Sequence, residues 1–268
     1  MNQVLESKEI DNYLSRLQFR AQPLVDRQTL DELIYLHQCS IPFETIDMHL
    51  CTEPPALDKE HVFNKLITQK RGGYCFELNL LFEMLLNSLG FVARPCLCRA
   101  VRGREGRMPI NHRGILVELD ESTLFADVGF GGPMAAGSLS LKETQEQIVR
   151  DETYSMRSID DSWWALERVT QAQGDLYGDE GPSRKQVELE LCMAAVEDLD
   201  FEALNLFFSR PGTLFHDVVI ANLRTATGYY GLRENTLTQR ENGESTKVEL
   251  SGEKEFSDAV LQHFGFLP

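Results

Sequence analysis

Apolar residues in the first 90 positions recur every three or four residues, which is the period of an amphipathic helix. Four such stripes are present, at residues 10–17, 30–36, 62–67 and 78–89. Asp26 precedes the second stripe and Asp58 the third, and each carboxylate can accept the unpaired N–H groups of a first helical turn. Gly90 follows the last stripe, where glycine commonly ends a helix. The pattern predicts an N-terminal bundle of helices over residues 1–90.

From residue 91 the pattern changes to short apolar runs separated by glycine and charged turns, which is typical of β-strands. The runs cover residues 91–101, 114–119, 124–128, 154–157 and 163–167. Residues 171–183 are polar and glycine-rich, which predicts a connector. We therefore expect a β unit over residues 91–185, for which a barrel is one arrangement.

The remaining residues, 186–268, mix both patterns. Helices are expected over residues 200–208 and 255–263, and strands over residues 218–223, 236–240 and 246–250. Asn242-Gly243 between the last two strands is typical of a two-residue hairpin turn. The expected fold class is α+β, with a helical part, a β part and a mixed part in that order.

Composition excludes several classes of protein. The 268 residues include 26 basic and 42 acidic side chains, for a formal charge of −16, so nucleic-acid and general membrane-surface binding are disfavoured. We find neither an apolar run of the ~18 residues that a membrane helix needs nor the apolar core of a signal peptide. We therefore expect a cytoplasmic protein.

The six cysteines predict free thiols rather than disulfides, because a chain of this length does not depend on cross-links and contains no CxxC pair. Cys96 and Cys98 point to one face of an expected strand. Since no second Cys or His pair at zinc spacing lies nearby, no metal site is expected there.

The segment most informative about chemistry is Arg71-Gly72-Gly73-Tyr74-Cys75-Phe76-Glu77. Its two glycines allow a sharp turn and leave Cys75 in the first turn of a long helix. The helix N-terminus stabilises a thiolate, which is the nucleophilic form of cysteine. Cys75 can also be a small buried hydrophobe. The other five cysteines lack this setting and are expected to be structural.

A thiol nucleophile needs a base and a group that orients the base. His112 precedes one expected strand and Asp127 follows another. If these strands are neighbours, Asp127 can hold one imidazole nitrogen while His112 presents the other to Cys75, as in cysteine proteases. Alone, His112 can be a loop histidine and Asp127 a turn former, but together the three residues predict a catalytic triad.

At this point the sequence resembles the arylamine N-acetyltransferase family over almost its whole length. The matching stretches are Ile41-Pro42-Phe43-Glu44, Arg71 to Glu77, His112, Ala126 to Gly131, Asp200-Phe201-Glu202 with Asn205, and His263-Phe264-Gly265. The resemblance implies a helical bundle, a β-barrel and an α/β lid. It also implies transfer of an acetyl group from acetyl-CoA, through a thioester on Cys75, to an arylamine, arylhydrazine or N-hydroxyarylamine. His112 is then the base and Asp127 its orienter, with ping-pong kinetics and no bound cofactor.

A flat aromatic acceptor requires an aromatic pocket, and Phe43, Tyr74 and Phe130 stand in the matching motifs, with Gly131 next to Phe130. Phe43 can equally be a core aromatic residue. Thr45-Ile46 stands where the family usually has Asn-Leu, which leaves the preferred acceptor open.

Six arginines gather around the loop that leads to His112. They are Arg94, Arg99, Arg102, Arg104, Arg107 and Arg113. They can form a solvated loop, or a positive entrance for the phosphates of CoA or for an acidic acyl carrier protein. The carrier would suit an amide synthase of the same family. Two further functions fit the same residues: a cysteine hydrolase of the papain or transglutaminase type, and a non-catalytic binding protein.

Overall fold

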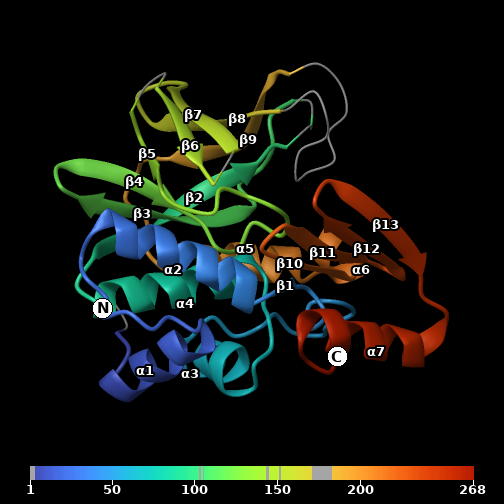
Figure 1. Ribbon diagram of the computed structural model, residues 1–268. Coiled ribbons are helices and arrows are strands. Elements are labelled where there is room, and N and C mark those ends of the chain that lie inside the picture. The colour runs from blue at the N-terminus through green and yellow to red at the C-terminus, as the bar shows by residue number, and fades with distance from the viewer. Residues whose placement is uncertain (1–3, 103, 105, 143–144, 151, 171–182) are drawn as a thin grey trace.

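Four helical segments form the N-terminal part of the computed structural model (Figure 1), which describes residues 4–102, 104, 106–142, 145–150, 152–170 and 183–268. They are α1 (Ser7–Arg16), α2 (Arg27–Ser40), α3 (Lys59–Phe63) with the π-helical turn η1 (Asn64–Thr68), and α4 (Cys75–Ser88). Asp26 accepts the N–H of Thr29, and Asp58 that of His61, so both predicted caps are confirmed. Gly90, with a φ of +97°, follows the end of α4 as predicted.

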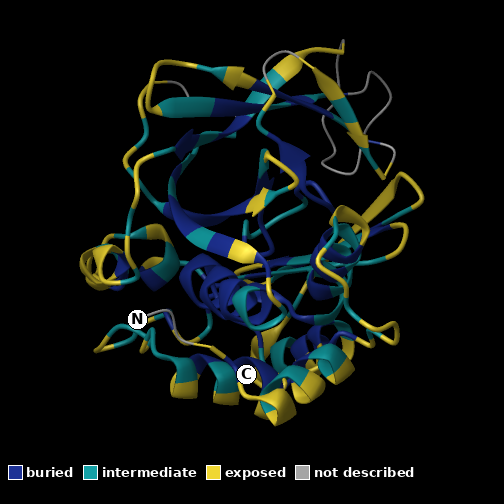
Figure 2. Ribbon diagram, turned by 90° about the vertical axis from the view of Figure 1, so that its left-hand side faces the viewer, coloured by how far each residue is buried: buried dark blue, intermediate teal, exposed yellow. Residues whose placement is uncertain are grey.

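The central helix of the molecule is α4, whose residues from Cys75 to Leu86 are all buried. It contributes to one hydrophobic core with α1, α2, α3, the first strands of the β unit and Phe201. Figure 2 shows buried residues concentrated inside, with exposed residues on the outer helices and loops. A helix that is buried on every side needs such all-round contact, and its buried polar residues Glu77, Asn79 and Glu83 need hydrogen-bond or ion-pair partners. Among the described residues, no helix is long and apolar enough to cross a membrane.

Eight antiparallel strands form a nearly closed barrel above the helices in Figure 1. They are β2 (Val92–Ala100), β3 (His112–Leu119), β4 (Ser122–Ala126), β5 (Leu139–Ser140), β6 (Glu146–Val149), β7 (Glu152–Ser158), β8 (Trp163–Val169) and β9 (Lys185–Cys192). Their order is β5-β4-β3-β2-β9-β8-β7-β6. The side chain of Gln147 in β6 bonds the backbone N–H and carbonyl of Ser140 in β5, at 2.7 and 2.8 Å, and so links the two edge strands.

Two sequence expectations about the barrel need correction. Strand β9 lies between β2 and β8, and its Leu189 and Leu191 pack inside the barrel, whereas the boundary after residue 185 assigned this strand to the lid. His112 is the first residue of β3 rather than a residue before it. The short strands β5 and β6 were not expected. The predicted connector falls at residues 171–183, of which 171–182 lie outside the described residues.

The lid follows the barrel and consists of two short helices, a sheet and a closing helix. Its elements are α5 (Asp200–Phe208), α6 (Leu214–Asp217), β10 (Ile220–Arg224), β11 (Gly228–Arg233), β12 (Thr236–Glu241), β13 (Glu244–Glu249) and α7 (Gly252–Phe264). Asn242 and Gly243 have φ of 50° and 85°, which confirms the predicted hairpin turn. Strand β1 (Phe43–Glu44) from the N-terminal part pairs with β10 and extends the sheet. Phe43 therefore lies where the bundle meets the lid.

Candidate active site

Cys75 is the first residue of α4 and is preceded by a turn that only small residues can form. A Cβ on Gly72 would collide with the carbonyl oxygen of Pro42. Next to it, the N–H of Glu44 donates to the carbonyl of Gly73 at 2.9 Å. The close approach of these two backbone segments explains the glycine pair and fixes where α4 begins.

Ion pairs and hydrogen bonds of buried charged residues stabilise the turn that precedes α4. Glu77 accepts the N–H of Tyr74 at 3.0 Å and the ammonium of Lys65 at 2.9 Å. Arg71 contacts Glu44 at 2.9 Å. Burial raises the pKa of Glu77, and the charge of Lys65 opposes that shift. Sequence reasoning did not identify Lys65, because its partners Glu44, Asp47 and Glu77 come from two other segments of the chain.

His112 and Asp127 meet beside Cys75, since β3 and β4 are neighbouring strands as expected. The Nε2 atom of His112 lies 2.7 Å from Oδ2 of Asp127, and all three side chains are buried. Burial alone would lower the pKa of His112, but the charge and hydrogen bond of Asp127 and a hydrogen bond with the Cys75 side chain raise it to about 10. Because Asp127 occupies Nε2, the nitrogen left for the thiol is Nδ1.

Asn79 is a site residue that the sequence analysis missed. Its amide donates to Oδ1 of Asp127 at 2.9 Å and to the carbonyl of Arg113 at 2.6 Å. Its oxygen accepts the N–H of Val128 at 2.9 Å. Asn79 follows Cys75 by four residues, so both lie on one face of α4. That spacing is the signal in the sequence from which it could have been found.

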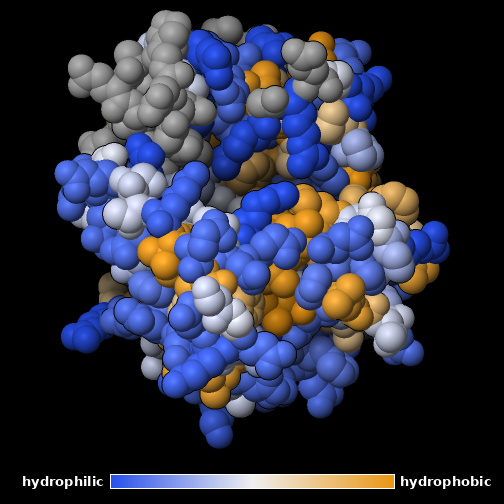
Figure 3. Space-filling model, turned by 90° about the vertical axis from the view of Figure 1, so that its right-hand side faces the viewer, coloured by the Kyte–Doolittle hydropathy of each residue, from blue (hydrophilic) through white to orange (hydrophobic). Residues whose placement is uncertain are grey.

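A cavity of about 580 Å³ opens onto Cys75 and His112. The lid contributes Phe207, Phe208 and Phe215 to its wall, none of which was predicted. On the face shown in Figure 3, hydrophobic side chains gather in and below a central hollow, and smaller hydrophobic patches are scattered over the mostly hydrophilic surface around it. The site therefore combines a buried thiol with an aromatic cavity.

Three of the four residues predicted to bind substrate line this cavity: Phe43, Phe130 and Gly131. The ring of Phe130 meets that of His112 edge to face, with centroids 5.7 Å apart. Gly131 has a φ of +82°, and a Cβ there would lie 2.9 Å from the ring of Phe43. Glycine is thus required at position 131 by both conformation and space.

Tyr74 is the exception and needs correction. It is fully buried, its hydroxyl donates to the amide oxygen of Asn205, and it is not among the residues that line the cavity. Its ring packs against Phe76 and Phe215. Tyr74 directly precedes α4, and its side chain points towards α5 in the lid, where it contacts Phe215.

The arginine cluster divides into paired and exposed members. Arg113 is buried against Glu83 and Asp198, both at 2.7 Å. Arg94 donates to the carbonyls of Met193 and Ala194. Arg99 pairs with Glu190 and stacks on the ring of Trp163. Arg102 pairs with Glu188 and stacks on the ring of Phe130. Arg104 and Arg107 are exposed and form no ion pair within the described part of the chain. Most of the cluster therefore stabilises the fold.

Metal ligation has no candidate among the residues that the structure describes, where no group of three or more His, Cys, Asp or Glu side chains could hold an ion. All six cysteines are free. The sulfur atoms of Cys96 and Cys98 lie 3.8 Å apart inside the barrel.

Comparison with known proteins extends over nearly the whole chain. The model of the family described as N-acetyltransferase matches residues 26–267. The arylamine N-acetyltransferase of Escherichia coli (strain K12) is 37% identical over 155 residues, which is 58% of this chain and 55% of that protein. The arylamine N-acetyltransferase of Mycolicibacterium smegmatis is 27% identical over 262 residues, or 96% and 91% of the two chains. The solved arylamine N-acetyltransferase from Salmonella typhimurium superposes with a TM-score of 0.87 at 25% identity, covering 98% of this chain and 92% of that one.

Proposed function

The chain belongs to the arylamine N-acetyltransferase family, and from this premise we propose that Cys75 carries an acetyl group from acetyl-CoA to an aromatic amine. The observation that supports the proposal most directly is that His112 is hydrogen-bonded to Asp127 and lines the same aromatic cavity as Cys75. In this assignment Cys75 and His112 are the catalytic residues, and Asp127 orients His112.

In the first half-reaction, His112 accepts the thiol proton and the Cys75 thiolate attacks the thioester carbonyl of acetyl-CoA. The negative oxygen that develops is assigned to the N–H groups in the first turn of α4, which have no partner within the helix. The carbon–sulfur bond to CoA then breaks, and the CoA sulfur takes the proton from His112. One thioester replaces another, so the free-energy change is small.

In the second half-reaction, an amine attacks the acetyl-Cys75 thioester and His112 accepts the proton that the amine loses. The amide leaves and the thiol of Cys75 is regenerated, which completes a ping-pong cycle. A flat acceptor ring fits the aromatic cavity, where Phe43, Phe130 and Phe215 offer apolar faces. The cavity thus suits a flat acceptor, and the resemblance to the family implies that this acceptor is an arylamine, arylhydrazine or N-hydroxyarylamine.

Positive charge at the cavity supports the choice of CoA as the donor. Arg104 lines the cavity from the barrel side and Arg233, in β11, lines it from the lid. Both side chains are exposed. We assign to these two arginines the attraction of the CoA phosphates. From the sequence, all six arginines of the cluster were candidates for this role.

Intact-mass spectrometry tests the proposal. The chain mixed with acetyl-CoA should gain the mass of one acetyl group, and an aromatic amine should remove it and yield the amide. Cys75→Ala should form no adduct, whereas Cys51→Ala, a partly buried thiol outside the cavity, should form it normally. An adduct that persists in Cys75→Ala contradicts the assignment. Loss of the adduct to water alone indicates a hydrolase, and no adduct on the parent indicates a binding protein.

A further inference from the structure

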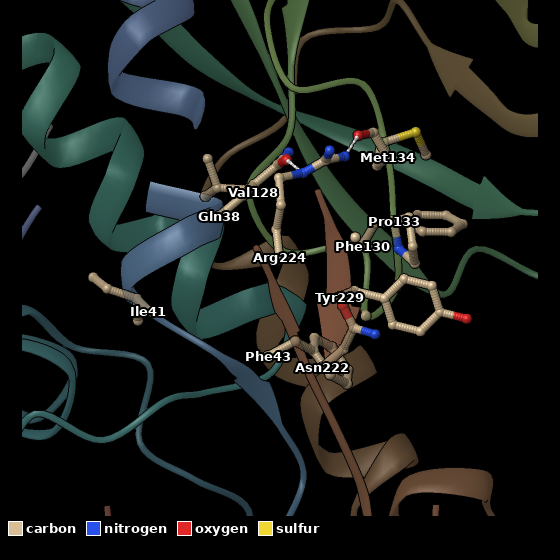
Figure 4. A pocket seen from close by; sticks show the side chains of 13 residues that line it. Gln38, Ile41, Phe43, Val128, Phe130, Pro133, Met134, Asn222, Arg224 and Tyr229 are labelled. Carbon is tan, nitrogen blue, oxygen red and sulfur yellow. Dashed lines mark hydrogen bonds between the residues drawn. The ribbon is translucent and has the colours of Figure 1, made fainter. Parts of the chain in front are cut away.

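The loop from Asp127 to Ala135 forms a thin wall between two cavities. Phe43, Phe130 and Gly131 line both the cavity that contains Cys75 and a second, smaller one behind it. Figure 4 shows this second cavity, in whose wall the side chain of Gln38 from α2 meets that of Arg224 from β10. Neither Gln38 nor Arg224 lines the cavity of Cys75.

Gln38 and Arg224 together hold the second half of this loop. The amide nitrogen of Gln38 donates to the carbonyl of Asp127 and to the carbonyl of Ala135, both at 3.0 Å, so it joins the two ends of the loop. Arg224 donates from Nε to the amide oxygen of Gln38 at 2.8 Å and from Nη2 to the carbonyl of Met134 at 2.5 Å. Dashed lines in Figure 4 mark the two bonds of Arg224.

Arg102, on the barrel side, also restricts this loop, because it donates to the carbonyl of Pro133 and its guanidinium lies 4.2 Å from the centre of the Phe130 ring. Apart from these contacts, few interactions fix the conformation of the loop. Within the described residues, positions 128–135 make no backbone–backbone hydrogen bond. Asn79 and the Asp127 side chain hold the N–H groups of Val128 and Gly129 at its beginning. Gly129, Gly131 and Gly132 give the rest of the loop many accessible conformations. Side chains from outside the loop must therefore restrict it.

We propose that Gln38 and Arg224 are positioning residues for the acceptor step. They fix the conformation of the loop so that Phe130 presents one face to the amine. Because Arg224 belongs to the lid sheet, the position of that sheet also determines the position of the loop. The inference rests on the proposed function, because it assigns the aromatic cavity to the acceptor. Arginine is required at position 224, because its planar fork reaches two acceptors at once and a lysine ammonium does not reproduce that geometry.

Separate measurement of the two half-reactions tests this role. Arg224→Met removes two hydrogen bonds, so the KM for the aromatic amine should rise by about five- to tenfold. Acetylation of Cys75 by acetyl-CoA should change by no more than about twofold, because Asn79 and the N–H of Gly129 still hold the Asp127 side chain. Lys247→Met is the matched control, since it removes a positive charge from exposed strand β13 of the same sheet and should change neither value. Arg224→Lys should be intermediate.

A double-mutant cycle tests whether the two residues act as a unit. Gln38→Leu and Arg224→Met should each raise the acceptor KM, and the double variant should be no worse than the more severe single variant. Multiplicative effects on KM would overturn the joint role. An unchanged acceptor KM in Arg224→Met and Arg224→Lys would overturn the proposal altogether.

Hydrogen exchange of the parent and Arg224→Lys gives a second readout that does not depend on activity. Amides of residues 128–135 should exchange faster in the variant while those of α4 keep their protection. Equal exchange in the loop would contradict the proposal even if the variant lost activity. Failure of the proposed function would instead show as a parent chain that forms no acetyl adduct, with the exchange difference intact.

Discussion

Two fully buried histidines lie beside α4, His37 in the helical bundle and His112 at the start of β3. His37 packs near Tyr13 and Phe82, and neither of its ring nitrogens has a hydrogen-bond partner among the described residues. Burial, aided by the charge of Arg16, lowers the pKa of His37 to about 3. At His112 the same burial is outweighed by Asp127 and Cys75, and the pKa rises to about 10. A carboxylate partner, not burial, decides whether the buried ring can hold a proton.

The two residues therefore act on stability with opposite signs. The folded-state pKa of His112 exceeds its ordinary value of about 6.5, so its contribution is fully present below that pH and is lost as pH rises towards 10. The folded-state pKa of His37 lies below 6.5, so folding becomes less favourable as pH falls from 6.5 towards 3. His37 in the bundle is therefore neutral near pH 7, whereas His112 in the site can hold a proton and exchange it with the thiol of Cys75.

Removing the carboxylate should eliminate the difference between the two histidines. Asp127→Asn should lower kcat/KM for arylamine acetylation by about 1,000- to 10,000-fold, because His112 loses the charge that orients and stabilises its protonated form. Steady-state kinetics with circular dichroism to verify the fold measures this. Asp160→Asn, in the turn between β7 and β8, is the control and should be active. A loss of less than tenfold in Asp127→Asn would show that Asp127 does not orient the base.

Removing the hydrogen bond that Asn79 donates to Asp127 should also lower kcat/KM, but by less than Asp127→Asn does. Asn79→Ala removes a hydrogen bond to a charged group, for which about 1.5–3 kcal/mol corresponds to about 10- to 100-fold in kcat/KM. Asn87→Ala, which cuts hydrogen bonds from the same helix to Ala93, should lower stability but not the rate per folded molecule. Equal kinetic losses in the two variants would remove Asn79 from the site.

The loss of stability at acidic pH tests the state of His37 in the helical bundle. Between pH 6.5 and pH 5, His37 should cost the folded state about 2 kcal/mol. His37→Leu should therefore unfold in urea with a free energy that falls less steeply over this range than that of the parent. Parallel pH profiles for parent and variant would contradict the buried, unpartnered state of His37.

The smallest effect is expected at the exposed mouth of the cavity, where water screens charge. Arg104→Gln combined with Arg233→Gln should raise the KM for acetyl-CoA by about two- to fivefold at low salt, and the difference should vanish at high salt. Arg99→Gln, whose guanidinium is already paired with Glu190, is the control and should leave this KM unchanged. No change in the double variant would place the CoA phosphates elsewhere.

Local signals in the sequence predicted the features that neighbouring residues determine. Asp26 and Asp58 cap helices, Gly72 and Gly73 place Cys75 at a helix start, and Asn242-Gly243 turns a hairpin. The neighbouring positions of β3 and β4 followed from a short turn between them, and this brought His112 to Asp127.

Features that depend on distant pairing were not predictable. Strand β9 enters the barrel beside β2, more than 80 residues earlier, and nothing in its own alternation identifies that partner. Tyr74 was misassigned because the direction of its side chain depends on Asn205 of α5. Gln38 and Arg224 meet only because the lid sheet folds back onto α2.

The pH dependence of Cys75 alkylation tests the central claim, that the partnered His112 activates this thiol. With iodoacetamide, Cys75 of the parent should react much faster than Cys75 of His112→Gln throughout pH 6 to 8, because His112, whose pKa is about 10, accepts the thiol proton in the parent. The two pH profiles should therefore differ in height and in shape. Superimposable profiles for the two proteins would contradict the account.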